Sequence, residues 1–228
     1  HALLLSQALD KNYIDKTDDS LINIAVAYYA KRKLSREYFL SLYYKGRILR
    51  NAGEYPKAML AYVEAEKYRD FPDNAYLVGL LYKQLGNLHY EYCDYPKSLS
   101  AYELASTYFA EASKNQHYAF CLYDIANVYR QMLNIKASEK MYLKAMDKAK
   151  TISYTYLYNA SICGLFMLYV EFDMQEKADS LYQNKEALLT STGYKSAYYA
   201  SLAKYYATIH DDEKSDYYMN EACDKAIN

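Results

Sequence analysis

A repeat of 40 residues runs through most of this chain. Three kinds of position follow it: aromatic, small and bulky. The members are Tyr62, Tyr102, Tyr142 and Tyr182 (aromatic), Ala58, Ser98, Ser138 and Ala178 (small), and Leu42, Tyr82, Leu122 and Ile162 (bulky). A fixed period of this length is typical of solenoids, in which each unit buries its apolar face against its neighbours. We therefore expect residues 1–228 to form one continuous array.

Each unit is expected to contain two amphipathic helices. Leu42, Gly46 and Leu49 have the i, i+4, i+7 spacing of a packed helix face. Gly53 follows, where a helix end favours a positive φ, and Pro56 suits the first turn of the next helix. The sequence predicts a close crossing of the two helices of a unit at the small residues.

A fourth kind of repeated position supports this close crossing of helices and shows in which unit the pattern breaks. The position is glycine or alanine in three units, at Gly46, Gly86 and Ala126, and becomes Phe166 in the fourth. A side chain larger than alanine would push two crossing helices apart. The pattern therefore indicates regular units in the middle of the chain and altered ones toward its end.

These residues carry a family resemblance. Tyr82, Leu85 and Gly86, followed by Ser98 and Tyr102, resemble the tetratricopeptide repeat. The resemblance covers three good repeats in 39–152 and two degenerate ones in 153–228, after an N-terminal helical cap in 1–38. It implies an all-α fold, a right-handed superhelix of about 12 helices. The period exceeds the usual one of about 34 residues, so we expect longer helices or longer links.

The cap has a second resemblance. Residues 8–13, followed by Asp18, Asp19 and Ser20 at the start of a predicted helix, resemble the N-terminal part of exported bacterial tetratricopeptide regulators. Such regulators carry a transmembrane helix and a signalling segment after the repeats. The resemblance implies the periplasmic or extracytoplasmic sensor piece of a longer protein, with a cytoplasmic location as the alternative.

Composition and motifs exclude several classes of function. The net charge is −1, unlike the strongly basic surface of a nucleic-acid binder. The longest apolar run, 162–170, is far shorter than the roughly 18 residues of a membrane span, so we expect no direct membrane contact. The sequence has no phosphate loop and no nucleophile or zinc motif, and its four cysteines lack metal-ligand spacing and are expected to be buried thiols. We expect no cofactor, no metal and no catalytic residue.

The better candidate site is a surface. In tetratricopeptide arrays the first helix of each pair lines the concave face. By this resemblance the ligand-binding candidates are Tyr43, Arg47, Arg50, Lys83, Asn87, Tyr90, Tyr123, Asn127 and Arg130. An asparagine amide both donates and accepts hydrogen bonds, as the backbone of an extended peptide requires, and the basic residues favour an anion. The alternative is that these side chains are simply solvated.

The sequence predicts a non-enzymatic module that binds a protein or peptide partner through this face. It would be the sensing or adaptor part of a longer bacterial regulatory protein. The alternative is a structural scaffold that self-associates as a homo-oligomer or docks another segment of the same protein. The clamp with which chaperone-binding tetratricopeptide domains hold a carboxylate is only half present, because Lys83 and Asn87 match it and Asp124 does not.

Overall fold

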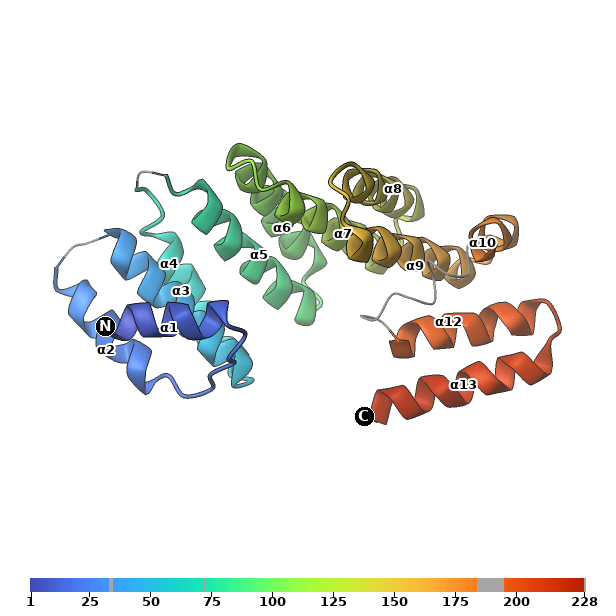
Figure 1. Cartoon of the computed structure of the whole chain (residues 1–228), viewed down its shortest axis with the longest axis horizontal. Helices are drawn as coiled ribbons and strands as arrows, with labels where there is room; N and C mark the ends of the chain where they lie inside the picture. Colours follow the sequence, from blue (N-terminus) through green and yellow to red (C-terminus); the bar gives the residue numbers. More distant parts are fainter. Residues whose placement is uncertain (33–34, 72, 184–194, 228) are drawn as a thin grey trace. The chain divides into compact units, whose positions relative to one another are not determined.

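The computed structural model describes residues 1–32, 35–71, 73–183 and 195–227, which contain helices and no strand (Figure 1). Pro72, the third proline, which the sequence places in the link between two units, lies outside these residues. Twelve helices are described. They are α1 (Ala2–Lys11), α2 (Ser20–Ala30), α3 (Ser35–Asn51), α4 (Tyr55–Glu66), α5 (Ala75–Glu91), α6 (Tyr95–Glu111), α7 (Asn115–Gln131), α8 (Ile135–Thr151), α9 (Thr155–Glu171), α10 (Gln175–Tyr182), α12 (Lys195–Thr208) and α13 (Asp212–Ile227).

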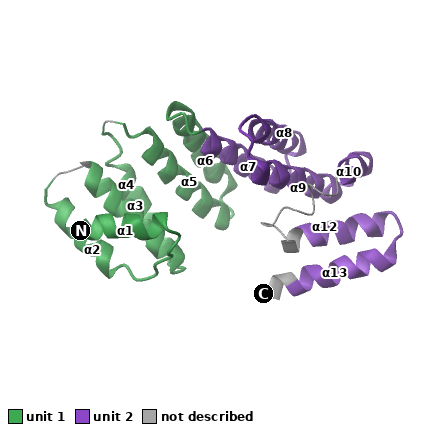
Figure 2. Cartoon of the chain, in the orientation of Figure 1, with its two compact units in different colours: residues 1–114 green, residues 115–228 purple. Residues whose placement is uncertain are grey.

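The contacts divide the chain into two compact units, 1–114 and 115–228 (Figure 2). In the first unit, α1 and α2 pack against α3, and α3/α4 and α5/α6 form helix pairs. In the second unit, α7/α8, α9/α10 and α12/α13 are paired, and α12 also contacts α9. That one repeat domain spans residues 1–228 stays a prediction.

The 40-residue period arises from the lengths of the helices. Each of α5 to α9 has 17 residues, and the links between them have three, so that each helix with its link occupies 20 residues. In each link the middle residue adopts the left-handed conformation, with φ between 54° and 57° from Cys93 to Asp173. The N–H of the next residue donates back to the helix, as Asn134 N does to the Tyr129 carbonyl over 2.9 Å. This is the Schellman ending, which stops each helix at the same place.

Substitutions at two of the left-handed link residues are expected to change the free energy of unfolding in opposite directions. Gly53 has φ 74° and nothing within 4 Å of an added Cβ, so Gly53→Ala introduces backbone strain without a clash. Leu133 has the same conformation with a side chain that is 69% exposed. We expect Gly53→Ala to lower the free energy of unfolding, and Leu133→Gly to raise it, by about 0.5–1 kcal/mol each. Urea denaturation measures both, and a shift of the same sign in both variants would contradict this account.

The close helix crossings predicted at the small residues are present. An added Cβ at Gly46 would lie 2.3 Å from the Tyr62 ring, and one at Gly86 would lie 2.6 Å from the Tyr102 ring. Serine adds a hydrogen bond at this crossing, because Ser98 Oγ donates to the Gly86 carbonyl over 2.9 Å. Ser138 to Ala126 and Ser215 to Ala203 repeat this bond at 2.9 and 3.0 Å. The small residue and the serine therefore act as one packing element.

The pattern changes after α9, as the sequence indicated. Phe166 is fully buried on α9, where its ring packs near Tyr182 of α10 and Tyr198 and Tyr205 of α12. Helix α10 has only eight residues. The ring of Phe166 thus packs among residues of three helices, α9, α10 and α12.

The cysteine prediction is partly wrong. Cys121 and Cys163 are buried, but Cys93 and Cys223 are exposed. Cys93 occupies the left-handed link position after α5, which faces solvent in every regular link. Two aspartates hydrogen-bond to the starts of helices: Asp18 Oδ1 accepts from Ser20 N at the start of α2, and Asp211 Oδ1 accepts from Lys214 N at the start of α13.

Candidate functional site

The predicted residues of α3 are held by internal contacts. Tyr43 is only 3% exposed and packs near the Tyr62 ring, so its ring belongs to the core. Burial raises the pKa of the Tyr43 phenol, which therefore stays neutral. Arg47 forms an ion pair with Asp10 of α1 at 2.7 Å. Arg50 bridges to α5, where it contacts Glu91 at 2.6 Å and Gln84 at 3.2 Å.

The three candidates on α5 differ in their surroundings. The Lys83 amine lies 5.9 Å from the centre of the Tyr102 ring. Asn87 Oδ1 accepts a hydrogen bond from the Tyr102 hydroxyl of α6 at 2.7 Å. Tyr90 packs edge-on against Tyr95, with ring centres 5.7 Å apart. Two of these contacts therefore join α5 to the second helix of its own pair through Tyr102.

The second unit repeats this arrangement. Asn127 Oδ1 accepts from the Tyr142 hydroxyl of α8 at 2.5 Å, as Asn87 does from Tyr102. Tyr123 is 4% exposed and packs against the same Tyr142 ring. Arg130 contacts Glu171 of α9 at 3.4 Å, which matches the Arg50 contact with Glu91 in the first unit.

The two asparagines keep a donor for a ligand. A tyrosine hydroxyl donates to the carbonyl oxygen of each amide, and this bond fixes which end of the amide points away from the helix pair. Within the described residues, Nδ2 of Asn87 and of Asn127 has no hydrogen-bond partner, and both side chains are half-buried. Each amide can therefore donate to a carbonyl oxygen of a bound chain.

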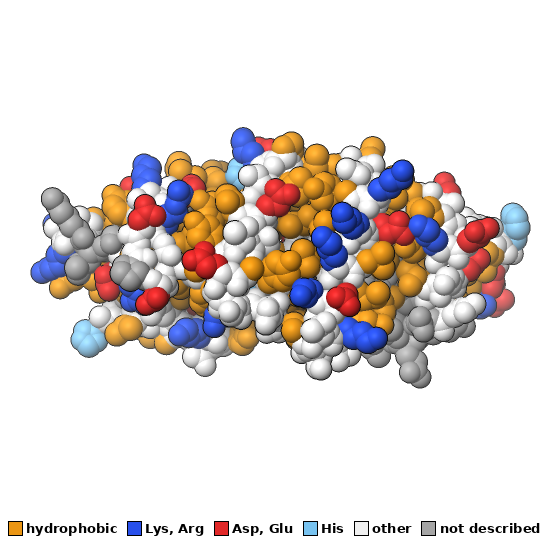
Figure 3. All heavy atoms as spheres, turned by 90° about the horizontal axis from the view of Figure 1, so that it is seen from above, with side chains coloured by type: hydrophobic (Ala, Val, Ile, Leu, Met, Phe, Trp, Pro, Cys, Tyr) orange, Lys and Arg blue, Asp and Glu red, His pale blue; other side chains and the backbone are white. Residues whose placement is uncertain are grey.

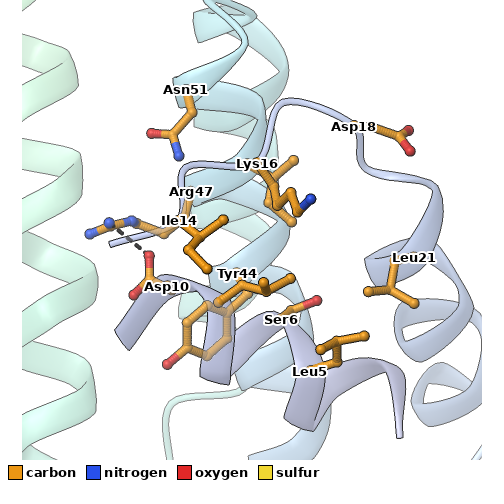
Figure 4. Close-up of a pocket in the computed structure, with 12 residues that line it drawn as sticks. Leu5, Ser6, Asp10, Ile14, Lys16, Asp18, Leu21, Tyr44, Arg47 and Asn51 are labelled. Atoms are coloured by element: carbon orange, nitrogen blue, oxygen red, sulfur yellow. Dashed lines mark ion pairs between the residues drawn. The ribbon is translucent and has the colours of Figure 1, made fainter. Parts of the chain in front are cut away.

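The first unit also contains a pocket of ≈ 340 Å³, which lies between α1, the link after it, α2 and α3 (Figure 4). Most of its wall is apolar. The lining residues are Leu5, Ser6, Leu9, Asp10, Ile14, Lys16, Asp18, Leu21, Tyr44, Arg47, Ile48 and Asn51. Small-molecule and side-chain pockets have volumes from about 300 Å³ upward and combine an apolar wall with a few polar groups.

Three polar groups give the pocket its chemistry. The Arg47–Asp10 ion pair lies at one side of the pocket (Figure 4). Burial raises the pKa of the Tyr44 phenol, and the nearby Asp10 carboxylate raises it further, so the hydroxyl stays a hydrogen-bond donor. Ser6 Oγ is buried and has no hydrogen-bond partner within the described part of the chain. A buried hydroxyl without a partner costs about 1–3 kcal/mol, which a ligand atom could recover.

Sequence reasoning missed most of this pocket. Arg47 was expected to face a ligand, but Ser6 and Asp10 were assigned only to a helical cap. The chain turns back toward α3 at Tyr13, whose φ is 57°, a conformation that tyrosine rarely adopts. The break in the 40-residue pattern before Phe39 was the one available signal that residues 1–38 have a different role from the repeats.

Among the residues that the structure describes, no three His, Cys, Asp or Glu side chains lie close enough together to hold a metal ion. The same residues contain no helix that is both long and apolar enough to cross a membrane. What the geometry provides is a set of donors, an apolar pocket and paired charges. Groups of these kinds are able to bind a ligand.

These features define the class of the chain by its fold: an all-α array of helix pairs of the tetratricopeptide type, as the sequence predicted. No protein-family model and no curated protein sequence matches it. Several solved structures match the chain. BtubC (BKLC) from P. vanneervenii has a TM-score of 0.68 and 16% identity, with 88% of this chain and 85% of that chain covered.

Two other structures extend this comparison. The tetratricopeptide-like repeats of a Podosopora anserina protein described as a kinesin light chain give a TM-score of 0.65 at 15% identity, covering 82% of this chain and 92% of that one. A Pyrococcus horikoshii signal transduction ATPase with numerous domains, which has a tetratricopeptide repeat sensor, gives 0.75 at 16% identity. That alignment covers 98% of this chain but only 35% of the ATPase. At such identities the similarity shows the fold alone.

Proposed function

We propose that this chain is a non-enzymatic module that binds a peptide or protein segment, as the sensing or adaptor part of a longer regulatory protein of bacterial type. The observation that carries the proposal is the pocket beside Arg47, with an apolar wall and the buried Ser6 hydroxyl that lacks a partner. An apolar side chain of the partner enters the pocket, and the partner's backbone or a polar atom accepts from Ser6.

The polar residues on the first helix of each pair extend this proposal. The free amide donor of Asn87 in the first unit suits a carbonyl group of an extended chain, and Asn127 offers the same donor in the second unit. The occurrence of a similar fold as the sensor of a signalling ATPase is in keeping with a sensing role. Tyr43 and Tyr123 act indirectly in this scheme, because both rings are buried in the core.

The pocket is tested with a matched pair of variants on α1. Leu5 lines the pocket and is 49% exposed, whereas the neighbouring Leu4 is 68% exposed and does not line it. A random peptide library is selected on the wild-type chain, and the affinity of the selected peptides is measured by fluorescence anisotropy. We expect Leu5→Trp to weaken binding more than tenfold because the indole fills the pocket, and Ser6→Ala to weaken it about fivefold through one lost hydrogen bond. Leu4→Trp should bind as the wild type does.

The same peptides test the asparagines. Asn87→Asp and Asn127→Asp keep an acceptor for Tyr102 and Tyr142 and replace the outward donor with a carboxylate oxygen, which accepts hydrogen bonds and carries negative charge. Weaker binding with an unchanged melting temperature supports a direct contact. If Leu5→Trp binds the peptides as tightly as Leu4→Trp, the pocket is not the recognition site.

A scaffold that self-associates is the second candidate, and exposed apolar side chains favour it. Leu4, Ile24 and Tyr28 on α1 and α2 are 68%, 64% and 49% exposed. An apolar face of this kind is typical of contacts with another chain. A mass that rises with concentration in light scattering would support self-association, and a constant monomer mass would exclude it.

A further inference from the structure

The second unit carries a row of lysines along the exposed side of α8. The four lysines are spaced at i, i+4, i+8 and i+12, about 6 Å apart along the helix axis. They are Lys136, Lys140, Lys144 and Lys148. Within the described residues none of them has an ion-pair partner, whereas Lys177 is paired with Glu139 at 2.6 Å. On the face seen in Figure 3, Lys and Arg side chains gather around apolar ones in the part of the molecule where α8 lies.

The repeat fold does not require this row. The buried residues of α8 recur in α6 at the 40-residue step, as Ser98 does for Ser138 and Tyr102 for Tyr142. The lysines do not recur: the same four positions are proline, serine, leucine and tyrosine in α6, and proline, leucine and glutamate in α4 followed by Tyr68 just after its end. The row is therefore a property of this surface and not of the packing of helix pairs.

The lysines border a shallow groove between α7 and α8. Its volume is ≈ 560 Å³, and all four lysines line it. Tyr118 and Leu122 of α7 and Leu143 of α8 supply its apolar part. Leu143 is 43% exposed, so that it is accessible from solvent. Of the two carboxylates in the lining, Glu139 is already paired with Lys177, and this leaves a clear excess of positive charge.

We propose that this groove binds an acidic peptide segment of a partner protein, with an apolar side chain placed on Leu122 and Leu143 and carboxylates along the lysine row. The spacing fits, because alternate residues of an extended chain are about 6.6 Å apart, close to the lysine spacing. The surface lies on the second unit and shares no residue with the pocket near Arg47. The two proposals therefore stand independently.

A peptide fits this surface better than two other anionic partners. A lipid bilayer requires apolar side chains that project outward, and this groove instead recedes between two helices. Single-stranded nucleic acid binds on exposed aromatic rings, and the one aromatic residue of the groove, Tyr118, is half-buried. An acidic peptide with an apolar side chain uses both the charge and the hollow.

The experiment measures the wild-type chain against an array of short peptides that carry glutamate at alternate positions, with the intervening residues varied. We expect binding of peptides that have a large apolar residue among the glutamates, weakened by added salt because the contacts are exposed charges. Lys140→Glu/Lys144→Glu should weaken the best binders more than tenfold, through two lost ion pairs and new repulsion. Leu143→Ser should weaken them several-fold.

Matched controls separate this result from a loss of folding or of overall charge. Lys11→Glu/Lys31→Glu makes the same change in net charge on exposed lysines of the first unit, and Leu104→Ser alters a leucine of α6 that is 42% exposed. Both should bind as the wild type does, and all variants should keep the wild-type melting temperature. The proposal is overturned if no peptide of the array binds, if the charge reversal has no effect, or if the chain binds phosphatidylserine vesicles or single-stranded DNA in preference to the peptides.

Discussion

Replacing Gly86 with leucine is expected to destabilise the first unit by about 3 kcal/mol, the upper part of the usual range for overpacking. The cause is the close crossing of α5 and α6, where even a Cβ would lie 2.6 Å from Tyr102. The Tyr102 ring cannot move aside easily, since it is 4% exposed and its hydroxyl is bonded to Asn87. A loss of this size lowers the melting temperature by about 6–12 °C in a chain of this length.

A second substitution supplies the control for Gly86. Gly86→Ala improves helix propensity by about 1 kcal/mol, so any loss of stability in this variant comes from the clash with the ring. Combining it with Tyr102→Leu, which removes the ring, should recover part of the loss as a favourable coupling energy. A melting temperature of Gly86→Leu within a degree or two of the wild type would show that Gly86 does not lie at the crossing.

The second large effect is expected at Phe166. The repeat pattern alone suggests that Phe166→Ala would restore the small residue of Ala126 and so improve the packing. The structure predicts the opposite, a loss of about 3–5 kcal/mol, because the buried ring fills the space between α9, α10 and α12. Removing it leaves a cavity that Tyr182 and Tyr205 cannot fill without leaving their stacked arrangement.

Denaturation in urea measures this loss, and hydrogen exchange locates it in α9 and α12. Phe166→Leu is the matched control, since it keeps most of the volume and should cost less than half as much. Stability of Phe166→Ala equal to that of the wild type would mean that the degenerate units follow the regular pattern after all.

The fold could be predicted from the sequence because its main determinants are periodic. The step shared by Gly86, Ser98 and Tyr102 and their equivalents specifies which residues meet at each crossing. The predicted length of the repeat unit was also correct. Only the structure shows that the residues in excess of the usual period lie in the helices and not in the links. The sequence showed that Phe166 breaks the repeat pattern. It did not show where the ring packs, because that depends on residues of three different helices.

The candidate site was less predictable, because a helix pattern gives the face on which a residue lies and not the neighbour that it reaches. Asn87 and Asn127 were expected to use both ends of their amides for a ligand, and each already uses one end for a tyrosine. The constant offset of 15 residues between asparagine and tyrosine could have indicated this bond. The pocket depends on the contact of Asp10 with Arg47, which joins two segments with no common period.

The uniform length of helix and link has a consequence for how such a chain can change. One inserted residue within a helix turns every later side chain of that helix by about 100°, which would move Tyr102 away from Gly86. Insertion of a whole 40-residue block begins and ends in equivalent links and leaves every crossing intact. The length of each segment is thus constrained as strictly as its key residues, so that this architecture tolerates growth by whole duplications and resists single-residue insertions or deletions in its helices.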